Sequence, residues 1–221
     1  MRIKSETKPV ASNQDETRQQ LLEAAGEVFA EAGFRNATVR EICRRAGANI
    51  AAVNYHFGDK ERLYKELLSY AHGKTLEKYP PLLGLPEDAA PEKKLRAFVL
   101  SLLLRIFDTG PTSWHGRLMA REMIEPSAAL DSLVEERIRP MSVQLSVIVG
   151  GILNRPPTDE CVRLCAFSVV SQCTFYKHCN PVMVRLFPNH SEMDAAAIEQ
   201  IADHITKFSL AALKSFVNKK S

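Results

Sequence analysis

The sequence predicts an all-α fold with a small N-terminal three-helix unit and a larger helical domain behind it. Apolar residues recur at intervals of three and four residues along most of the 221-residue chain, and no convincing alternating strand pattern is present. Glycines and prolines punctuate the periodic segments. A proline-rich segment over residues 79–91 marks the expected seam between the two parts.

Composition narrows the class of protein. Hydrophobic residues make up 45% and charged residues 25%, as in globular proteins with a buried core. No run of about 18 apolar residues predicts a membrane span. The polar residues 1–14 lack the apolar segment of a signal peptide and are expected to form a flexible arm. Five cysteines, an odd number, favour free thiols, and we expect a cytoplasmic protein.

The first helices can be placed from their caps. Apolar spacing predicts a helix over residues 15–32, ended by Gly33, with Phe34 folding back onto it. A second helix begins at Thr38, which forms a predicted capping box with Glu41, and ends at Gly47. A short helix follows from residue 49 or 50 to residue 56, and a fourth covers residues 60–78. Two short helices joined by a tight turn are helix-turn-helix architecture.

The charge pattern favours DNA binding by this motif. Residues 34–65 carry seven basic and three acidic side chains, a net charge of +4, whereas residues 15–31 carry five acids and one arginine. A recognition helix must present its first turns to base edges. The candidate DNA-binding residues are Thr38, Arg40, Arg44, Arg45, Asn49, Ala51, Asn54, Tyr55, His56 and Lys60, whereas Val53 and Phe57 are expected in the core. The alternative is a three-helix unit that only packs.

The stretch from Thr17 to Tyr64 contains FAEAGFRNATVREICRRAG and NIAAVNYHFGDKERLY, and it resembles the DNA-binding domain of the TetR family of repressors. The resemblance implies that Thr38 caps the second helix, that residues 49–56 form the recognition helix and its edge, and that Lys60 contacts phosphate. Further along, REMIEPSAA at residues 121–129 and IRP at 138–140 resemble the CecR subgroup, which is associated with drug sensitivity and efflux genes. The expected domains are 15–62 for DNA binding, 60–78 as a linking helix and 79–221 for effector binding and dimerisation.

The rest of the chain predicts helices over 91–108, 112–125, 127–153, 158–179 and 192–217, with Pro140 interrupting the third of these. Large, soft and polar side chains there suit a pocket for a small-molecule effector. The candidate ligand-binding residues are Phe107, Trp114, His115, Leu118, Met119, Glu122, Met123 and Tyr176. The alternative is that the apolar members are core and the charged members are solvated.

The last two helices are expected to build a homodimer through a four-helix bundle, which the resemblance also implies. Their apolar faces are Val162, Cys165, Ala166, Val169, Val170 and Cys173, then Ile198, Ile201, Ala202, Ile205, Phe208, Leu210, Ala212 and Leu213. The alternative is packing within one subunit.

No catalytic constellation is apparent, so no catalytic residue, cofactor or enzyme activity is expected. Cysteines 161, 165, 173 and 179 suit buried hydrophobes better than a metal site, although a metal or redox role stays open. The sequence therefore predicts a ligand-responsive repressor, dimeric on a palindromic DNA operator. The alternatives are a ligand-independent DNA-binding module and a helical-bundle enzyme.

Overall fold

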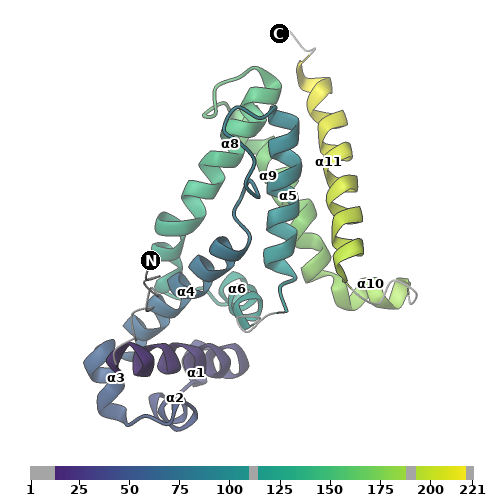
Figure 1. The fold of residues 1–221 in the computed structure, drawn as a ribbon. Helices are drawn as coiled ribbons and strands as arrows, with labels where there is room; N and C mark the ends of the chain where they lie inside the picture. Colours follow the sequence, from purple (N-terminus) through teal and green to yellow (C-terminus); the bar gives the residue numbers. More distant parts are fainter. Residues whose placement is uncertain (1–12, 110–113, 188–192, 218–221) are drawn as a thin grey trace, which may run out of the picture. The chain divides into compact units, whose positions relative to one another are not determined.

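The structure, a computed structural model, describes residues 13–109, 114–187 and 193–217 (Figure 1). Every regular element in these residues is helical, which confirms the all-α prediction. The chain divides into two compact units, Met1–Leu67 and Leu68–Ser221, and the boundary falls inside helix α4. No helix among the described residues is both long enough and apolar enough to cross a membrane.

The first unit consists of three helices and the beginning of a fourth. Their bounds are α1 Asn13–Asn36, α2 Val39–Ala46, α3 Ile50–His56 and α4 Lys60–Lys78. Phe29 of α1 and Tyr64 of α4 meet edge to face, with ring centroids 4.7 Å apart. Phe34 packs 4.9 Å from the same tyrosine ring, so the expected fold-back of Phe34 is confirmed. Leu21, Ile42, Val53, Leu63 and Leu67 are fully buried and complete the core of this unit.

A break within α1 separates its body from the link to α2. Gly33 has φ 76° and ψ 166°, a conformation that suits only glycine, so the regular helix ends there as expected. Helix α2 ends on Gly47, whose φ of 63° and ψ of 24° form a left-handed cap. The expected N-terminal arm lies outside the described residues up to residue 12, and residues 13–14 already belong to α1.

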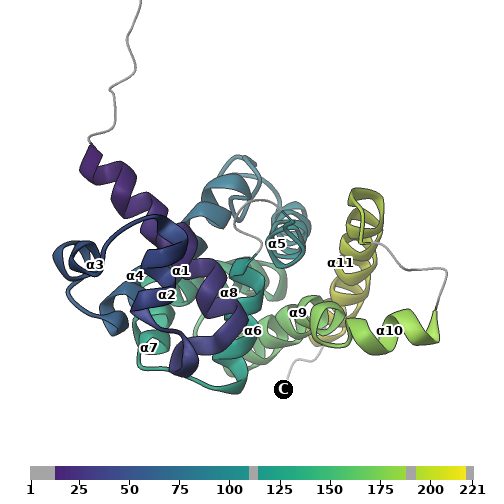
Figure 2. The same ribbon diagram turned by 90° about the horizontal axis from the view of Figure 1, so that it is seen from below.

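The second unit is a helical bundle in which α5, α8, α9 and α11 surround the main core (Figures 1 and 2). Its bounds after α4 are α5 Pro91–Ile106, α6 Trp114–Ile124, α7 Ala129–Leu133, the π-helical turn Val134–Ile138, α8 Arg139–Leu153, α9 Glu160–His178, α10 Asn180–Leu186 and α11 Ala195–Val217. The expected start of the sixth helix at residues 112–113 lies outside the described residues. Leu95, Leu103, Leu145, Val149, Val162 and Ile205 are among the fully buried members of this core.

Two prolines show how position decides their effect. Pro140 lies in the first turn of α8, directly after the π-helical turn, so the predicted interruption of the helix is confirmed. Pro181 lies in the first turn of α10, a helix that the sequence analysis missed. We expected prolines only as breaks between periodic segments, but proline also fits the start of a helix, where its missing N–H has no intrahelical partner.

Candidate DNA interface and effector cavity

Local caps hold α3 as a short, separate helix. The Thr38 hydroxyl accepts a hydrogen bond from the Glu41 amide (3.2 Å) at the start of α2. The Asn49 side-chain oxygen accepts from the Ala52 amide (3.0 Å) at the start of α3. The expected capping box is half formed, because among the described residues no hydrogen bond joins the Thr38 amide to Glu41. The Gly47 cap at the end of α2 and the Asn49 cap at the start of α3 fix the turn between these helices.

Helix α3 is anchored by one side chain and leaves most of its surface free. Val53 is fully buried and Phe57, which follows the helix, is 4% exposed, so both core predictions are confirmed. Tyr55 is 71% exposed and Ile50 is 51% exposed. Ala51 and Asn54 are also exposed. The helix therefore presents small and hydrogen-bonding groups on its outer face, as entry into a DNA groove requires.

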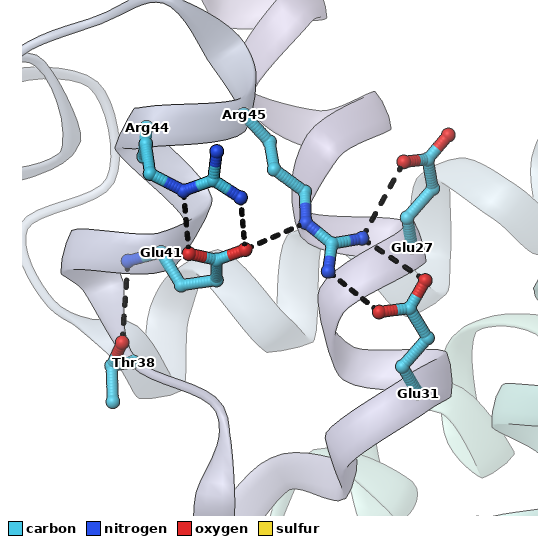
Figure 3. A network of polar contacts seen from close by, with 6 residues as sticks. All are labelled: Glu27, Glu31, Thr38, Glu41, Arg44 and Arg45. Atoms are coloured by element: carbon cyan, nitrogen blue, oxygen red, sulfur yellow. Dashed lines mark hydrogen bonds and ion pairs between the residues drawn. The ribbon is translucent and has the colours of Figure 1, made fainter.

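Carboxylates pair with part of the positive charge that the sequence predicts for this unit (Figure 3). Arg45 donates to Glu31 (2.6 and 3.0 Å) and to Glu41 (2.9 Å), and lies 3.8 Å from Glu27. Arg44 forms a fork to Glu41 (2.8 and 2.7 Å). Hydrogen bonds from Arg44 and then Arg45 lower the pKa of Glu41 from 4.5 to about 2, and Glu31 and Glu41 raise the pKa of Arg45. Arg45 thus ties α2 to α1 and is neutralised by carboxylates.

The remaining basic residues differ in whether their side chains have interaction partners. The exposed side chains of Arg35 and Arg40 have no ion-pair partner in the described part of the chain. Lys60 donates to the carbonyl oxygen of Arg35 (3.3 Å) and lies 4.7 Å from the centre of the Phe34 ring. Arg40, on α2, is therefore the freest of the basic residues that we expected to bind phosphate.

The second unit contains a cavity of about 340 Å³. Helices α4, α5, α6, α8 and α9 and the π-helical turn line it. Its apolar lining includes Phe98, Leu102, Ile106, Met119, Ala120, Ile138, Met141, Leu145, Ala166 and Val170. Met123, Phe167 and His178 also line it and are exposed, so the cavity opens between α6 and α9. Its size and lining fit a small-molecule site.

Three buried polar side chains face this cavity. His72, Arg105 and His115 are 6%, 6% and 8% exposed. The atoms His72 Nδ1, Arg105 Nη2 and His115 Nε2 have no hydrogen-bond partner among the described residues. Burial, assisted by neighbouring positive groups, lowers the pKa of His72 to about 3 and that of His115 to about 4. Buried polar atoms without a hydrogen-bond partner are rare in folded proteins, so these three atoms mark the polar end of the cavity as a candidate binding site.

The structure divides the candidate ligand-binding residues into two groups. His115, Met119 and Met123 line the cavity. Trp114, Leu118, Phe107, Glu122 and Tyr176 are not part of its lining. Trp114 and Leu118 are buried. Glu122 accepts hydrogen bonds from the amide and hydroxyl of Ser127, both 3.1 Å.

Sequence reasoning missed the two most informative residues of the cavity. Arg105 lies in the apolar run from Ala97 to Phe107, and an isolated arginine in a buried stripe was an available signal. His72 lies on α4, which we read as a linking helix. Periodicity showed which face of each helix is buried, but not that these faces leave a space between them.

The cysteines are free thiols in the structure. The described residues contain no group of three or more His, Cys, Asp or Glu side chains arranged to hold a metal ion. Cys173 is fully buried, and burial raises the pKa of its thiol to about 12. It therefore packs as a small hydrophobe.

The apolar faces expected to form a dimer are mostly occupied within the subunit. Val162, Ala166, Val169, Cys173, Ile198, Ala202, Ile205 and Leu213 belong to its own core. We assigned these residues wrongly, because the strongest apolar stripe of a helix packs into the nearest core. Phe208 is 61% exposed on α11, and Leu164 and Phe175 are 54% and 53% exposed on α9. Gln172 of α9 donates to the buried Ser209 of α11 (3.2 Å), so these two helices are neighbours.

Family models match both parts of the chain. A model described as bacterial regulatory proteins, tetR family, matches residues 21–67. A model described as the C-terminal domain of the HTH-type transcriptional dual regulator CecR matches residues 91–213. The chain therefore belongs to the TetR family of bacterial regulatory proteins, with a C-terminal domain of the CecR type.

Individual relatives agree with this assignment. The CecR regulator of Shigella flexneri is 30% identical over 144 residues, which cover 62% of this chain and 64% of that protein. The HTH-type transcriptional repressor AcnR of Corynebacterium efficiens is 42% identical over 67 residues, 30% of this chain and 33% of that one. The chain thus spans less than two thirds of the length of these curated relatives. A transcriptional regulator from Pseudomonas aeruginosa PAO1 has the same fold, with a TM-score of 0.69 at 17% identity over 94% of this chain and 96% of that one.

Proposed function

We propose that this protein is a DNA-binding transcriptional repressor that acts as a homodimer on a near-palindromic operator and releases it when a small molecule binds. The observation that carries the proposal is the placement of α3. Its single buried anchor, Val53, leaves Ala51, Asn54 and Tyr55 exposed on one short capped helix. A helix held in this way can place its N-terminal half in the major groove.

Two copies are required because one α3 reads only a few base pairs. The outer faces of α9 and α11 carry the exposed Leu164, Phe175 and Phe208, which suit a four-helix bundle across a two-fold axis. Two recognition helices then enter successive major grooves about 34 Å apart. The effector changes this spacing, and it weakens DNA binding only by its difference in affinity for the two arrangements.

Selection from random DNA duplexes tests the proposal. We expect the full-length protein to enrich a near-palindrome whose half-sites are about one helical turn apart. Enrichment of no sequence, or of a single half-site, would contradict the dimeric arrangement.

A double variant of α3 and a control variant then test whether α3 is the recognition helix. Replacing Asn54 and Tyr55 together by alanine should abolish operator binding while the circular dichroism spectrum stays unchanged. Lys93→Ala, at an exposed position on α5, is the matched control and should bind as the unmodified protein does. If the double variant binds the operator as tightly as the unmodified protein, then α3 is not the recognition helix.

A further inference from the structure

Arg105 is a buried cation without a counter-charge in the described part of the chain. Its Nε donates to the carbonyl oxygen of Ser101 (3.2 Å) and its Nη1 contacts Met141 Sδ (2.8 Å). Its Nη2 has no partner there. Burial lowers the pKa of Arg105 to about 10, which still leaves the guanidinium charged at neutral pH. A buried charge without a partner destabilises a folded protein, so its presence calls for an explanation.

The nearby acidic groups do not neutralise Arg105. The Cys173 thiol interacts with it electrostatically, but burial raises the pKa of that thiol to about 12, so it stays neutral. Asp108 accepts a hydrogen bond from Lys78 at 2.6 Å. The described lining of the cavity includes Arg105 and Lys177 but no carboxylate.

His72 and His115 add two more donors beside this charge. Their rings lie 5.7 Å apart, edge to face, and each has one ring nitrogen without a partner among the described residues. A neutral imidazole can donate from either nitrogen, depending on its tautomer. The polar end of the cavity therefore offers one fixed positive charge and two neutral donors, all more than nine-tenths buried.

The remainder of the cavity is apolar. Phe98, Leu102, Met119 and Val170 form its walls. Lys177 lies on the exposed side, with its Nζ 5.4 Å from the centre of the Phe107 ring. A ligand that fills this space needs an apolar body and one polar end.

We propose that the cavity binds an amphipathic carboxylic acid, with the carboxylate on Arg105 Nη2 and beside His72 and His115, and with the apolar body between α5, α6 and α9. The proposal rests on the proposed function only in identifying this ligand as the effector. One carboxylate matches one buried cation, whereas a doubly charged phosphate would bring a second uncompensated charge into the cavity. Arginine also binds a carboxylate with directed, charge-assisted hydrogen bonds.

Calorimetric titration of the full-length protein at pH 7.4 tests the head group. The probes are octanoate, octanamide and octylammonium, together with 4-phenylbutanoate and its amide. We expect each acid to bind about tenfold or more tightly than its amide, as charge-assisted hydrogen bonds imply, and octylammonium not to bind. An amide that binds as tightly as its acid, preferential binding of octylammonium, or failure of both acids to bind would overturn the proposal.

The variant Arg105→Met tests whether Arg105 binds the carboxylate. The variant should lose the preference for acid over amide and still bind octanamide. Without ligand it should melt at a higher temperature than the unmodified protein, because methionine removes a buried charge without leaving a partner behind. Arg117→Gln, at an exposed position outside the lining, is the matched control and should retain the preference. A variant that melts lower and still prefers octanoate would make Arg105 structural and overturn the assignment.

Operator affinity is measured separately. Octanoate binding without loss of operator affinity would leave the ligand assignment standing and refute the proposed ligand response. Normal operator binding without any preference for acids would refute the ligand assignment alone. Should Arg105→Met fail to fold, the head-group series on the unmodified protein still decides the proposal.

Discussion

Arg45 Nη2 lies 2.6 Å from Glu31 Oε2, and this ion pair joins α2 to α1 across 14 residues of sequence. The same guanidinium also donates to Glu41. A positively charged residue of the helix-turn-helix thus serves the internal structure of the unit. Arg40, on the same helix, has no such partner among the described residues. The two arginines should therefore respond differently to removal.

Arg40→Ala should weaken operator binding and reduce the slope of log affinity against log salt concentration by about 1, the effect of losing one phosphate contact. Arg45→Ala should leave that slope nearly unchanged, because carboxylates already neutralise this charge. Fluorescence anisotropy on one operator over a series of salt concentrations measures both. Equal losses of slope would show that Arg45 contacts phosphate as well.

In thermal unfolding, Arg45→Ala should have the larger effect and Arg40→Ala the smaller one. Arg45→Ala should lower the melting temperature slightly, because it removes the hydrogen-bonded ion pairs with Glu31 and Glu41 that join α2 to α1 and cross the first turn of α2. Arg40→Ala, the matched control, should melt as the unmodified protein does. A lower melting temperature for Arg40→Ala alone would contradict the geometry of the network.

Gly33→Ala should destabilise the first unit by about 1–3 kcal/mol, because φ 76° and ψ 166° are unfavourable for any residue with a Cβ. Gly47→Asn is the matched control. Its left-handed backbone tolerates asparagine, and a Cβ there meets nothing within 4 Å. Urea unfolding followed by circular dichroism measures both. A Gly33→Ala variant as stable as the unmodified protein would rule out this backbone conformation.

Stability should fall as the pH drops below about 6.5, because the unfolded chain then binds protons that His72 and His115 exclude. Their folded pKa values are about 3 and about 4, against 6.5 when exposed, so their contribution is complete above pH 6.5 and is lost toward the folded values. Burial opposes protonation of both histidines, and so does the positive charge of Arg105. His115 and Arg137 add to this effect at His72.

Each of these histidines should contribute up to about 1.4 kcal/mol per pH unit to the slope of the free energy of unfolding against pH. Urea unfolding between pH 5 and 6.5, above the range in which ordinary carboxylates titrate, measures the slope. His72→Leu should reduce it, whereas His204→Gln, at an exposed position on α11, should not. A slope that His72→Leu leaves unchanged would show that His72 is open to solvent.

Replacing Phe175 and Phe208 together by glutamate should convert the proposed dimer to a monomer, because it would place charges in the core of the proposed interface. Sedimentation velocity measures the state. Leu186→Glu, at a 64% exposed position on α10, is the control and should remain dimeric. A double variant that stays dimeric would move the interface away from α9 and α11.

Much of the fold could be predicted from local sequence. Thr38, Gly33 and Gly47 set the ends of the first helices through backbone chemistry that depends only on neighbouring residues. Val53 and Phe57 could be assigned to the core because their spacing places them on the inner side of the turn. The short helix α10 was missed because Pro181 has opposite meanings inside a helix and at its start.

The charge of the first unit shows where local reasoning stops. The count of basic residues over 34–65 treats Arg40 and Arg45 alike. The folded chain separates them, since α1 brings Glu27 and Glu31 next to Arg45. Glu41 is close to Arg45 in sequence, but the partners on α1 lie 14 and 18 residues away, and nothing near Arg45 in the sequence specifies their contribution.

The sequence by itself determined most of the helices and the ends of the first three, because caps and periodicity act within a few residues. Only the tertiary structure decided that the apolar stripes of five helices leave a cavity between them, and that Arg105, His72 and His115 meet in it from α5, α4 and α6. The physical reason is that a cavity and the loss of a counter-charge are properties of several packed surfaces together, whereas a helix is a property of one segment.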